Sequence, residues 1–353
     1  MTHKMNPKVD YNLCHSEEFS TGIIEWLRGK GAILIVTHDH PDPDALAASF
    51  ALQHLILVKT GQLATIAFGG GIGRRENLVM VDQLEIKSKA IGELDLDTFN
   101  AVCMVDTQPE TGNNSYPADR RIDLVIDHHE IREQTQACRW VDVRPEYGAS
   151  ATILFEYLQA QGVKIATKLA TILFYAIKSE TEDLGRDWNK SDRGAYMKLM
   201  PLCNNRILHE ITRPKSSPIY FKYFETGLRN AKIYGNALVF NLYIIDHQEI
   251  VAEIADFLMR VEGIEIVLGL GCYKEEGVLS LRTSHHETHA GILMQKIIKG
   301  LGTGGGHSMT AGGQIRHLEA VRGSLGAMEY ELTGRLMAAL GREHTEPKPL
   351  VER

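Results

Sequence analysis

Cysteine is scarce in this sequence and follows neither a metal-binding nor a disulfide pattern. The five cysteines among 353 residues are scattered, and no two have CxxC spacing: Cys14, Cys103, Cys138, Cys203 and Cys272. An odd and scattered set predicts neither a disulfide framework nor a thiolate zinc site. We therefore expect reduced thiols in a reducing compartment.

A long apolar run and an excess of basic residues are also missing. No segment has the length of a membrane span, and the first residues lack the basic flank and apolar core of a signal peptide. We therefore expect a cytoplasmic protein without a membrane partner. The formal net charge is −7, from 38 basic and 45 acidic side chains. Because proteins that track long duplex nucleic acid usually have a basic face, this charge favours a small phosphorylated substrate.

The length and composition fit an α/β protein with two domains. Apolar residues make up 44% of the chain and charged residues 24%, and 353 residues are more than one core usually holds. In the first part, short apolar runs alternate with helical segments, and the runs cover residues 32–37, 63–68, 101–105 and 122–126. This alternation predicts a parallel sheet covered by helices, in a domain over residues 1–190.

The pattern changes in the second part of the chain. Helical segments dominate from residue 149 onward, and those within residues 191–232 are expected to form a helical linker. From about Asn236, the order strand, helix, strand, strand predicts a smaller mixed α/β domain over residues 233–353. This domain closes with a glycine-rich segment and a long helix.

Acidic and imidazole side chains follow three of the predicted strands. They are the run over residues 37–44, then Asp106, then Asp127-His128-His129. Because the carboxyl ends of parallel strands share one crevice, we expect these side chains to converge, and the carboxylates would repel one another without bound cations. Oxygen and nitrogen ligands without thiolate favour Mn²⁺, with Mg²⁺, Co²⁺, Zn²⁺ or Fe²⁺ as alternatives. Two ions about 3.5–4 Å apart would activate water for attack on phosphorus.

Simpler explanations exist for each feature taken alone. An Asp after a strand is often a helix cap or a turn residue. For Asp106 or Asp127 taken singly, the odds of such a structural role are about even. The segment over residues 285–289 resembles a zincin motif but lacks its Glu after the first His, which favours surface histidines. The glycine run over residues 69–73 does not fit a dinucleotide fingerprint, which favours a plain turn over a phosphate loop.

The ordered set of motifs resembles a known family. His38-x-x-Pro41-Asp42-x-Asp44, then Asp106, then Asp127-His128-His129, then Gly304-Gly305-Gly306-His307 is similar to the DHH superfamily of phosphoesterases. The last segment resembles the DHHA1 substrate-binding domain of the nanoRNase and pAp phosphatase branch. The resemblance covers residues 20–340, and the set in this order is far more specific than any one motif.

The resemblance implies roles for the residues of the first domain. His38 and Asp42 would bind one metal ion, Asp44 and His128 would bind the other, and Asp106 would bridge the two. Asp127 would orient His128, and His129 would lie beside the phosphate. Asp106, Asp127 and His129 are therefore the expected catalytic residues.

The resemblance also implies a substrate site in the second domain and a homodimer. Arg282 matches the family's substrate arginine, whose guanidinium suits bidentate phosphate binding. Gly304, Gly305 and Gly306 would let backbone N–H groups approach a phosphate, with His307 beside them.

The sequence departs from the family at the fourth motif. Relatives carry Thr-Asp-Thr after an apolar helix, whereas residues 178–183 read Lys-Ser-Glu-Thr-Glu-Asp. Ungapped alignment puts Glu180 at the metal-ligand position, and Asp183 is the nearest rival. Both are kept as candidate ligands.

These residues lead to one main hypothesis and two rivals. The main hypothesis is a Mn²⁺-dependent hydrolase of short oligonucleotides, linear dinucleotides or pAp. One rival is a polyphosphate or pyrophosphate hydrolase that uses the same metal domain. The other is a nucleotide-binding sensor with weak catalysis, which the altered fourth motif motivates.

Overall fold

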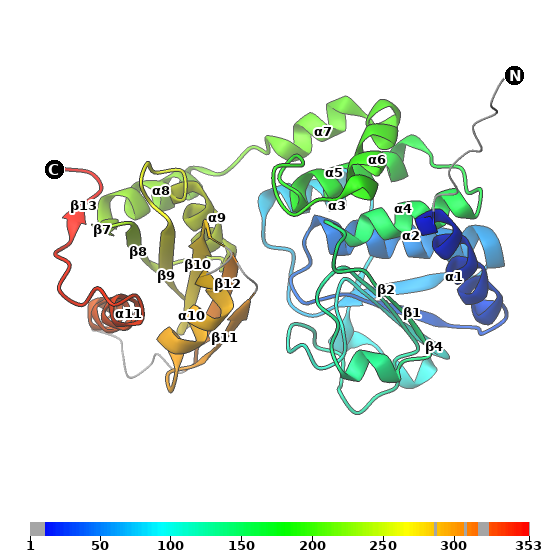
Figure 1. The fold of residues 1–353 in the computed structure, drawn as a ribbon, viewed down its shortest axis with the longest axis horizontal. Coiled ribbons are helices and arrows are strands. Elements are labelled where there is room, and N and C mark those ends of the chain that lie inside the picture. The colour runs from blue at the N-terminus through cyan, green and yellow to red at the C-terminus, as the bar shows by residue number, and fades with distance from the viewer. Residues whose placement is uncertain (1–10, 286–287, 307–308, 317–324, 353) are drawn as a thin grey trace, which may run out of the picture. The chain divides into compact units, whose positions relative to one another are not determined.

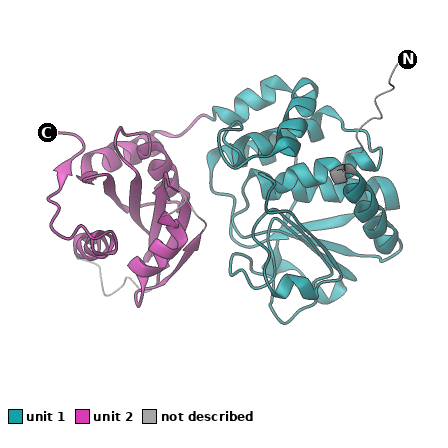
Figure 2. Ribbon diagram, viewed as in Figure 1, with its two compact units in different colours: residues 1–214 teal, residues 215–353 magenta. Residues whose placement is uncertain are grey.

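The chain folds into two compact units (Figures 1 and 2). The computed structural model describes residues 11–285, 288–306, 309–316 and 325–352. Unit 1 spans residues 1–214 and unit 2 spans residues 215–353. The boundary between them falls inside the segment predicted as a helical linker, whose helices are divided between the two units.

Unit 1 is built on a six-stranded sheet with the order β3-β2-β1-β4-β5-β6, in which every pair is parallel. The strands are β1 (Ile33–Val36), β2 (Ala64–Phe68), β3 (Lys89–Ala90), β4 (Ala101–Val105), β5 (Leu124–Asp127) and β6 (Trp140–Val143). The prediction of a parallel sheet is confirmed, and four of these strands coincide with the predicted apolar runs. The edge strands β3 and β6 were not predicted.

Seven α-helices complete the described part of unit 1. They are α1 (Tyr11–Leu27), α2 (Pro43–Thr60), α3 (Arg75–Gln83), α4 (Ser150–Ala160), α5 (Thr167–Glu180), α6 (Lys190–Leu199) and α7 (Asn205–Thr212). Strand residues alternate between two layers: Ile33 and Ile35 face the helical layer, while Leu34 and Val36 pack on the other side with residues of the segments 91–99 and 116–122.

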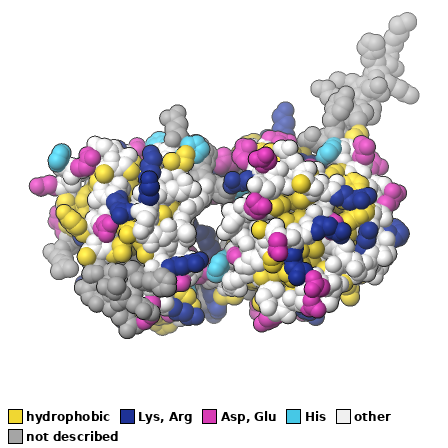
Figure 3. All heavy atoms as spheres, turned by 90° about the horizontal axis from the view of Figure 1, so that it is seen from below, with side chains coloured by type: hydrophobic (Ala, Val, Ile, Leu, Met, Phe, Trp, Pro, Cys, Tyr) yellow, Lys and Arg dark blue, Asp and Glu magenta, His cyan; other side chains and the backbone are white. Residues whose placement is uncertain are grey.

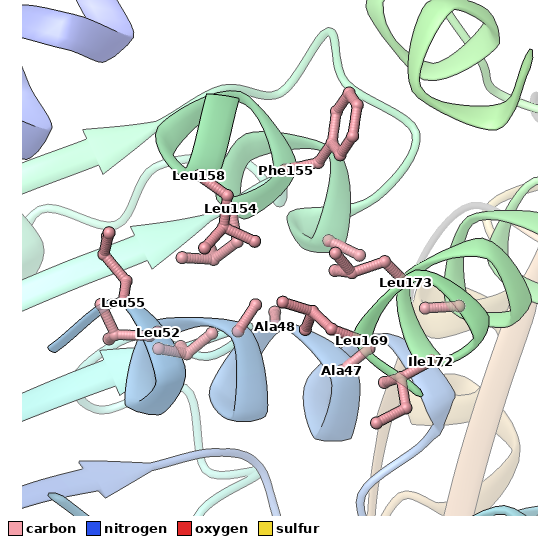
Figure 4. Close-up of a cluster of buried hydrophobic side chains, with 14 of the residues drawn as sticks. Ala47, Ala48, Leu52, Leu55, Leu154, Phe155, Leu158, Leu169, Ile172 and Leu173 are labelled. Atoms are coloured by element: carbon pink, nitrogen blue, oxygen red, sulfur yellow. The ribbon is translucent and has the colours of Figure 1, made fainter. Parts of the chain in front are cut away.

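The helical layer is held together by small side chains on α2. Figure 4 shows Ala47 and Ala48 among the leucines that α4 and α5 contribute to this core. Both alanines are completely buried. Because an alanine adds little bulk at a contact, α2 packs closely against both neighbours.

Asp42 determines where α2 begins. Its side chain accepts hydrogen bonds from the backbone N–H groups of Asp44 and Ala45, and Pro43 occupies the first helical position. This is a favourable N-cap, because the side chain satisfies amides that have no partner within the helix. The cap fixes residues 42–44 at the start of α2, a few residues after the end of β1.

Unit 2 is built on a seven-stranded mixed sheet with the order β11-β12-β10-β9-β8-β7-β13. The strands are β7 (Lys232–Tyr234), β8 (Ala237–Ile244), β9 (Ile266–Tyr273), β10 (Glu276–Thr283), β11 (Thr303–Gly306), β12 (Thr310–Ile315) and β13 (Lys348–Pro349). Among the described strands of unit 2, only β8 and β9 pair in parallel. This confirms the prediction of a smaller mixed α/β domain.

Helices cover both faces of the sheet in unit 2. They are α8 (Pro218–Asn230), α9 (Glu249–Leu258), α10 (Ala290–Ile298) and α11 (Leu325–Ala339). Buried residues of α10 and α11 pack on one face, and those of α8 and α9 pack on the other. Within the described residues of both units, no helix combines the length and apolar character that a membrane span requires.

A buried ion-pair network ties β6 to α4 in unit 1. Arg144 donates from Nε and Nη2 to the two carboxylate oxygens of Asp142, over 2.8 and 2.6 Å, and from Nη1 to Glu156 over 2.8 Å. Tyr157 also donates to Asp142, over 2.5 Å. Burial opposes ionisation of Asp142, but the Arg144 guanidinium outweighs it and lowers the pKa of that carboxyl.

We predict that Asp142→Asn destabilises the protein by about 3 kcal/mol at neutral pH, because removing one partner leaves a buried charge poorly compensated. Because folding lowers the pKa of Asp142, its carboxylate stabilises the fold at pH values above about 3.9, the ordinary pKa of Asp. This contribution is lost as the pH falls through the pKa of the folded state. The difference between wild type and variant should therefore shrink in acid. Urea denaturation at several pH values measures it.

Asp97→Asn is the matched control, because its carboxylate pairs with Arg120 at the surface and should leave the denaturation midpoint unchanged. An Asp142→Asn midpoint equal to that of wild type at neutral pH would contradict the prediction.

Candidate metal centre

The predicted ligands converge at one edge of the sheet in unit 1. β1, β4 and β5 are neighbours and run in parallel, so their carboxyl ends lie side by side. His38 follows β1, Asp106 follows β4, and His128 follows β5. The positions of these side chains follow directly from the order of the strands.

The first group consists of His38, Asp42 and Asp106. The Nε2 atom of His38 lies 3.7 Å from an oxygen of Asp42 and 3.6 Å from Oδ2 of Asp106. The candidate ligand atoms of these three residues all lie within 4.8 Å of one another. For ions with ligands at about 2.1 Å, neighbouring ligands are about 3 Å apart and opposite ones about 4.2 Å, so these separations fit a cation between the side chains.

The second group lies on the other side of Asp106. The Nε2 atom of His128 is 3.5 Å from Oδ1 of Asp106 and 3.8 Å from Oδ2 of Asp44. His129 is also near, since its Nδ1 lies 3.9 Å from Oδ1 of Asp106. Asp106 thus presents a different oxygen to each histidine, His38 and His128.

Asp106 has an unusual backbone conformation. Its φ angle is 59°, in the left-handed region that non-glycine residues rarely adopt. Its amide still donates to the carbonyl of Ile126 over 3.0 Å. Such strain is typical of residues whose position matters for function.

The N-terminus of α4 supports the second group. The amides of Ser150 and Ala151 donate to the two oxygens of Asp44 over 2.6 and 2.8 Å, and the Ser150 hydroxyl donates to Asp106 over 2.8 Å. A helix N-terminus stabilises anions, so it favours carboxylates at this place. Sequence reasoning missed Ser150, and its only signal was its position at the start of a predicted helix.

The ring of His128 is oriented by a backbone carbonyl. Its Nδ1 donates to the carbonyl of Tyr147 over 3.1 Å, which directs Nε2 toward Asp44 and Asp106. The prediction that Asp127 orients this ring is wrong. Oδ1 of Asp127 instead lies 2.9 Å from Nδ1 of His129, across the bend that follows β5.

Glu180 and Asp183, the two candidates for the fourth motif, lie in different surroundings. Burial, with the charges of Asp42 and Asp106, raises the pKa of Glu180 to about 6, although His128 acts in the opposite direction. Glu180 therefore belongs electrostatically to the cluster. Asp183 pairs instead with Lys178 and accepts from the Tyr196 hydroxyl over 2.7 Å, and its side chain is 54% exposed.

The cluster is electrostatically strained without a cation. Burial opposes the charged ring of His38, but Asp106 and Asp42 hold its pKa well above the usual value. Burial, followed by the charges of Asp106 and Glu180, raises the pKa of Asp44 as well. These carboxylates compete for protons because they crowd one another, and a divalent cation would relieve that repulsion. The donor set, carboxylate oxygens and imidazole nitrogens, suits Mn²⁺ or Mg²⁺.

The predicted substrate residues of unit 2 lie toward one end of three adjacent strands. Arg282 on β10 pairs in register with Thr310 on β12, and Gly306 on β11 pairs with the next residue, Ala311. Nε of Arg282 is paired with Asp256, and its Nη1 donates to the Ser280 hydroxyl over 2.9 Å.

Packing requires two of the three glycines, whatever they bind. A Cβ at Gly304 would lie 2.9 Å from Met294, and a Cβ at Gly306 would lie 2.2 Å from the carbonyl oxygen of Thr310. A Cβ at Gly305 would meet nothing within 4 Å. His307 lies outside the described residues.

Comparison with known protein families identifies both units. The model of the DHH family, N-terminal domain, matches residues 32–177, and the model of the DHHA1 domain matches residues 235–333. The chain belongs to the DHH family. The expected family is therefore confirmed, with both of its domains.

Individual relatives of this DHH protein match over part of their length. An uncharacterized protein of Methanocaldococcus jannaschii is 33% identical over 288 residues, which are 81% of this chain and 58% of that protein. A probable manganese-dependent inorganic pyrophosphatase of Staphylococcus haemolyticus is 27% identical over 148 residues, 42% of this chain and 47% of that protein. The DHH protein thus spans about half the length of the curated relatives it matches.

A solved structure shares the whole fold of this DHH protein. It is an exopolyphosphatase-related protein from Bacteroides fragilis, with a TM-score of 0.70 and 16% identity, and the match covers 95% of this chain and 100% of that one. The similarity concerns the fold, since the identity is low.

We predict that Glu180→Gln weakens Mn²⁺ binding about 10- to 100-fold, because it removes a negative charge from the cluster. Asp183→Asn is the matched control and should bind Mn²⁺ as wild type does, since Asp183 faces Lys178 and Tyr196. Calorimetric titration of each metal-free protein with Mn²⁺ makes the comparison. The reverse result, a loss in Asp183→Asn alone, would assign the ligand to Asp183.

Proposed function

We propose that this DHH protein is a manganese-dependent phosphoesterase that binds two metal ions and hydrolyses short oligonucleotides, linear dinucleotides or pAp. The observation that carries the proposal is the placement of Asp106. Its Oδ2 lies 3.6 Å from His38 and its Oδ1 lies 3.5 Å from His128. One carboxylate between two imidazoles has the arrangement of a bridging ligand in a two-metal site.

The side chains fall into two ligand sets. His38 and Asp42 would hold one ion, Asp44 and His128 the other, and Asp106 both, with Glu180 adding negative charge beside them. When bound, the ions supply Lewis acidity toward the phosphate and lower the pKa of water. Manganese is favoured because the ligands are oxygen and nitrogen atoms and because curated relatives carry the name of manganese-dependent enzymes.

The chain's own residues position the reacting phosphate. Asp127 engages Nδ1 of His129 over 2.9 Å, which fixes the orientation of a ring that we propose lies beside the reacting phosphate. Asp127 also accepts from the amides of His128 and His129 over 2.8 and 3.3 Å. A ring held in this way can stabilise charge on the leaving oxygen without reorganising.

The DHHA1 domain supports a nucleotide as the substrate. Nε and Nη1 of Arg282 are engaged with Asp256, Ser280 and Leu281, so Nη2 is the nitrogen that would donate a charge-assisted hydrogen bond to a phosphate oxygen. On the face seen in Figure 3, basic and acidic side chains are mixed on both units. A mixed surface and a net charge of −7 favour a short substrate over a long duplex.

Hydrolysis of pyrophosphate or polyphosphate is the second candidate function. It is favoured by the curated relatives named as probable inorganic pyrophosphatases. The match to them covers 42% of this chain, whereas Arg282 and the segment Gly304-Gly305-Gly306 resemble a nucleotide-handling domain. This is why a nucleotide substrate is preferred.

We predict that the Mn²⁺-loaded protein hydrolyses pApA and pAp faster than pyrophosphate or polyphosphate. Asp106→Asn should lower the rate of hydrolysis of every substrate more than about 100-fold, because it removes the ligand shared by both ions. Arg282→Ala should lower kcat/KM on pApA about 10- to 100-fold, the value of a charge-assisted hydrogen bond, and leave pyrophosphate hydrolysis unchanged. A phosphate-release assay on the substrate panel measures these rates.

Arg335→Ala is the matched control for Arg282→Ala, because Arg335 pairs with Glu331 on α11 and should not alter activity. A preference for pyrophosphate or polyphosphate, with no effect of Arg282→Ala, would establish the second candidate function. Tight binding of pAp without any hydrolysis would indicate the sensor.

A further inference from the structure

The ring of His38 is oriented by the backbone of the next residue. Its Nδ1 lies 2.9 Å from the carbonyl oxygen of Asp39. A carbonyl only accepts, so Nδ1 carries a proton and Nε2 is the nitrogen that faces the cluster. The position of the Asp39 backbone therefore decides where the ligand atom of His38 lies.

The side chain of Asp39 fastens this backbone to two loops. Its Oδ1 accepts from the amides of Gly69 and Ser115 over 2.8 and 3.0 Å, and its Oδ2 accepts from the Ser115 hydroxyl over 2.6 Å. The Asp39 amide donates to the carbonyl of Asn113 over 2.7 Å. Asp39 is thus held by the loop after β2 and by the loop after β4, and we call Asp39, Gly69 and Ser115 the Asp39 clasp.

The glycine run that was expected to form a plain turn is the surface against which residues 39 and 40 lie. A Cβ at Gly69 would lie 2.3 Å from Oδ1 of Asp39 and 2.4 Å from the Ser115 hydroxyl. Gly70 has a φ of 66°, and a Cβ there would lie 2.5 Å from the ring of His40. The amide of His40 donates to the carbonyl of Gly69 over 3.1 Å. These glycines are explained by close approach of the ligand-bearing segment.

The ligands of the second metal position depend on a different part of unit 1. Asp44 is held by Ser150 and Ala151, and His128 by the carbonyl of Tyr147. That segment is fastened in turn by Asp192, which is completely buried. Its carboxylate accepts from the Gly148 amide over 2.8 Å and from the Thr152 hydroxyl over 2.6 Å.

We propose that Asp39 is a positioning residue that sets the metal affinity of one position only, the one that His38 and Asp42 form with Asp106. The inference rests on the proposed two-metal site. Asp39 does not contact the metal position, and it acts through the carbonyl that orients His38. The other metal position, that of Asp44 and His128, is supported by Asp192 and is independent of the Asp39 clasp.

The test is a calorimetric titration of the full-length, metal-free protein with Mn²⁺ and no substrate. Wild type should show two binding steps. Asp39→Ala should weaken one step about 10- to 100-fold, the usual effect of losing a residue that orients a ligand, and leave the other unchanged. Asp192→Asn should weaken the step that Asp39→Ala spares.

Conservative variants separate positioning from a general loss of structure. Asp39→Asn keeps an acceptor for the Gly69 and Ser115 amides, so it should recover most of the affinity that Asp39→Ala loses. Ser115→Ala removes the hydroxyl contact alone and should have a smaller effect on the same step. Asp95→Ala is the control, because Asp95 accepts from the Asp97 amide in an exposed turn and should leave both steps unchanged.

Each result decides the inference. Equal weakening of both steps in Asp39→Ala, or no change in either, would overturn the role of Asp39 while leaving the two-metal site in place. A wild-type protein that binds fewer than two Mn²⁺ ions would overturn the two-metal site itself, and the inference with it.

Discussion

The carboxylate of Asp106 between two imidazoles is the interaction on which the rest of unit 1 depends. Three adjacent parallel strands end at one edge of the sheet, and each delivers a polar side chain there. Carboxylates gathered in this way repel one another, and burial makes the repulsion stronger. Burial and that repulsion raise the pKa of Asp44, and attraction to Asp106 and Asp42 raises the pKa of His38 in spite of burial. The proposed pair of divalent cations would compensate the negative charge.

The surrounding structure holds the ligands against this repulsion. Backbone groups make many of these contacts. The first amides of α4 donate to Asp44, and backbone carbonyls accept from the rings of His38 and His128. Such contacts keep ligands in place before any ion arrives, which reduces the cost of binding. Two separate supports also mean that the two proposed metal positions need not have the same affinity.

The sequence predicted the strands and the ligand cluster because both follow from local patterns. Apolar runs identify buried strands, and strand ends place polar residues at one edge. The edge strand Lys89–Ala90 has no apolar pattern, so it was missed. The supports of the site were missed as well, since backbone amides and carbonyls have no sequence signature. Asp39 and Ser115 are 76 residues apart, and only the fold brings them together. The different surroundings of Glu180 and Asp183 are likewise set by the fold and have no sequence signature.

Anomalous diffraction from crystals soaked in Mn²⁺ tests the two-metal site most directly. We predict two manganese peaks about 3.5–4 Å apart, with Asp106 between them, His38 beside one and His128 beside the other. A single peak, or peaks that do not share Asp106, would contradict the proposed arrangement.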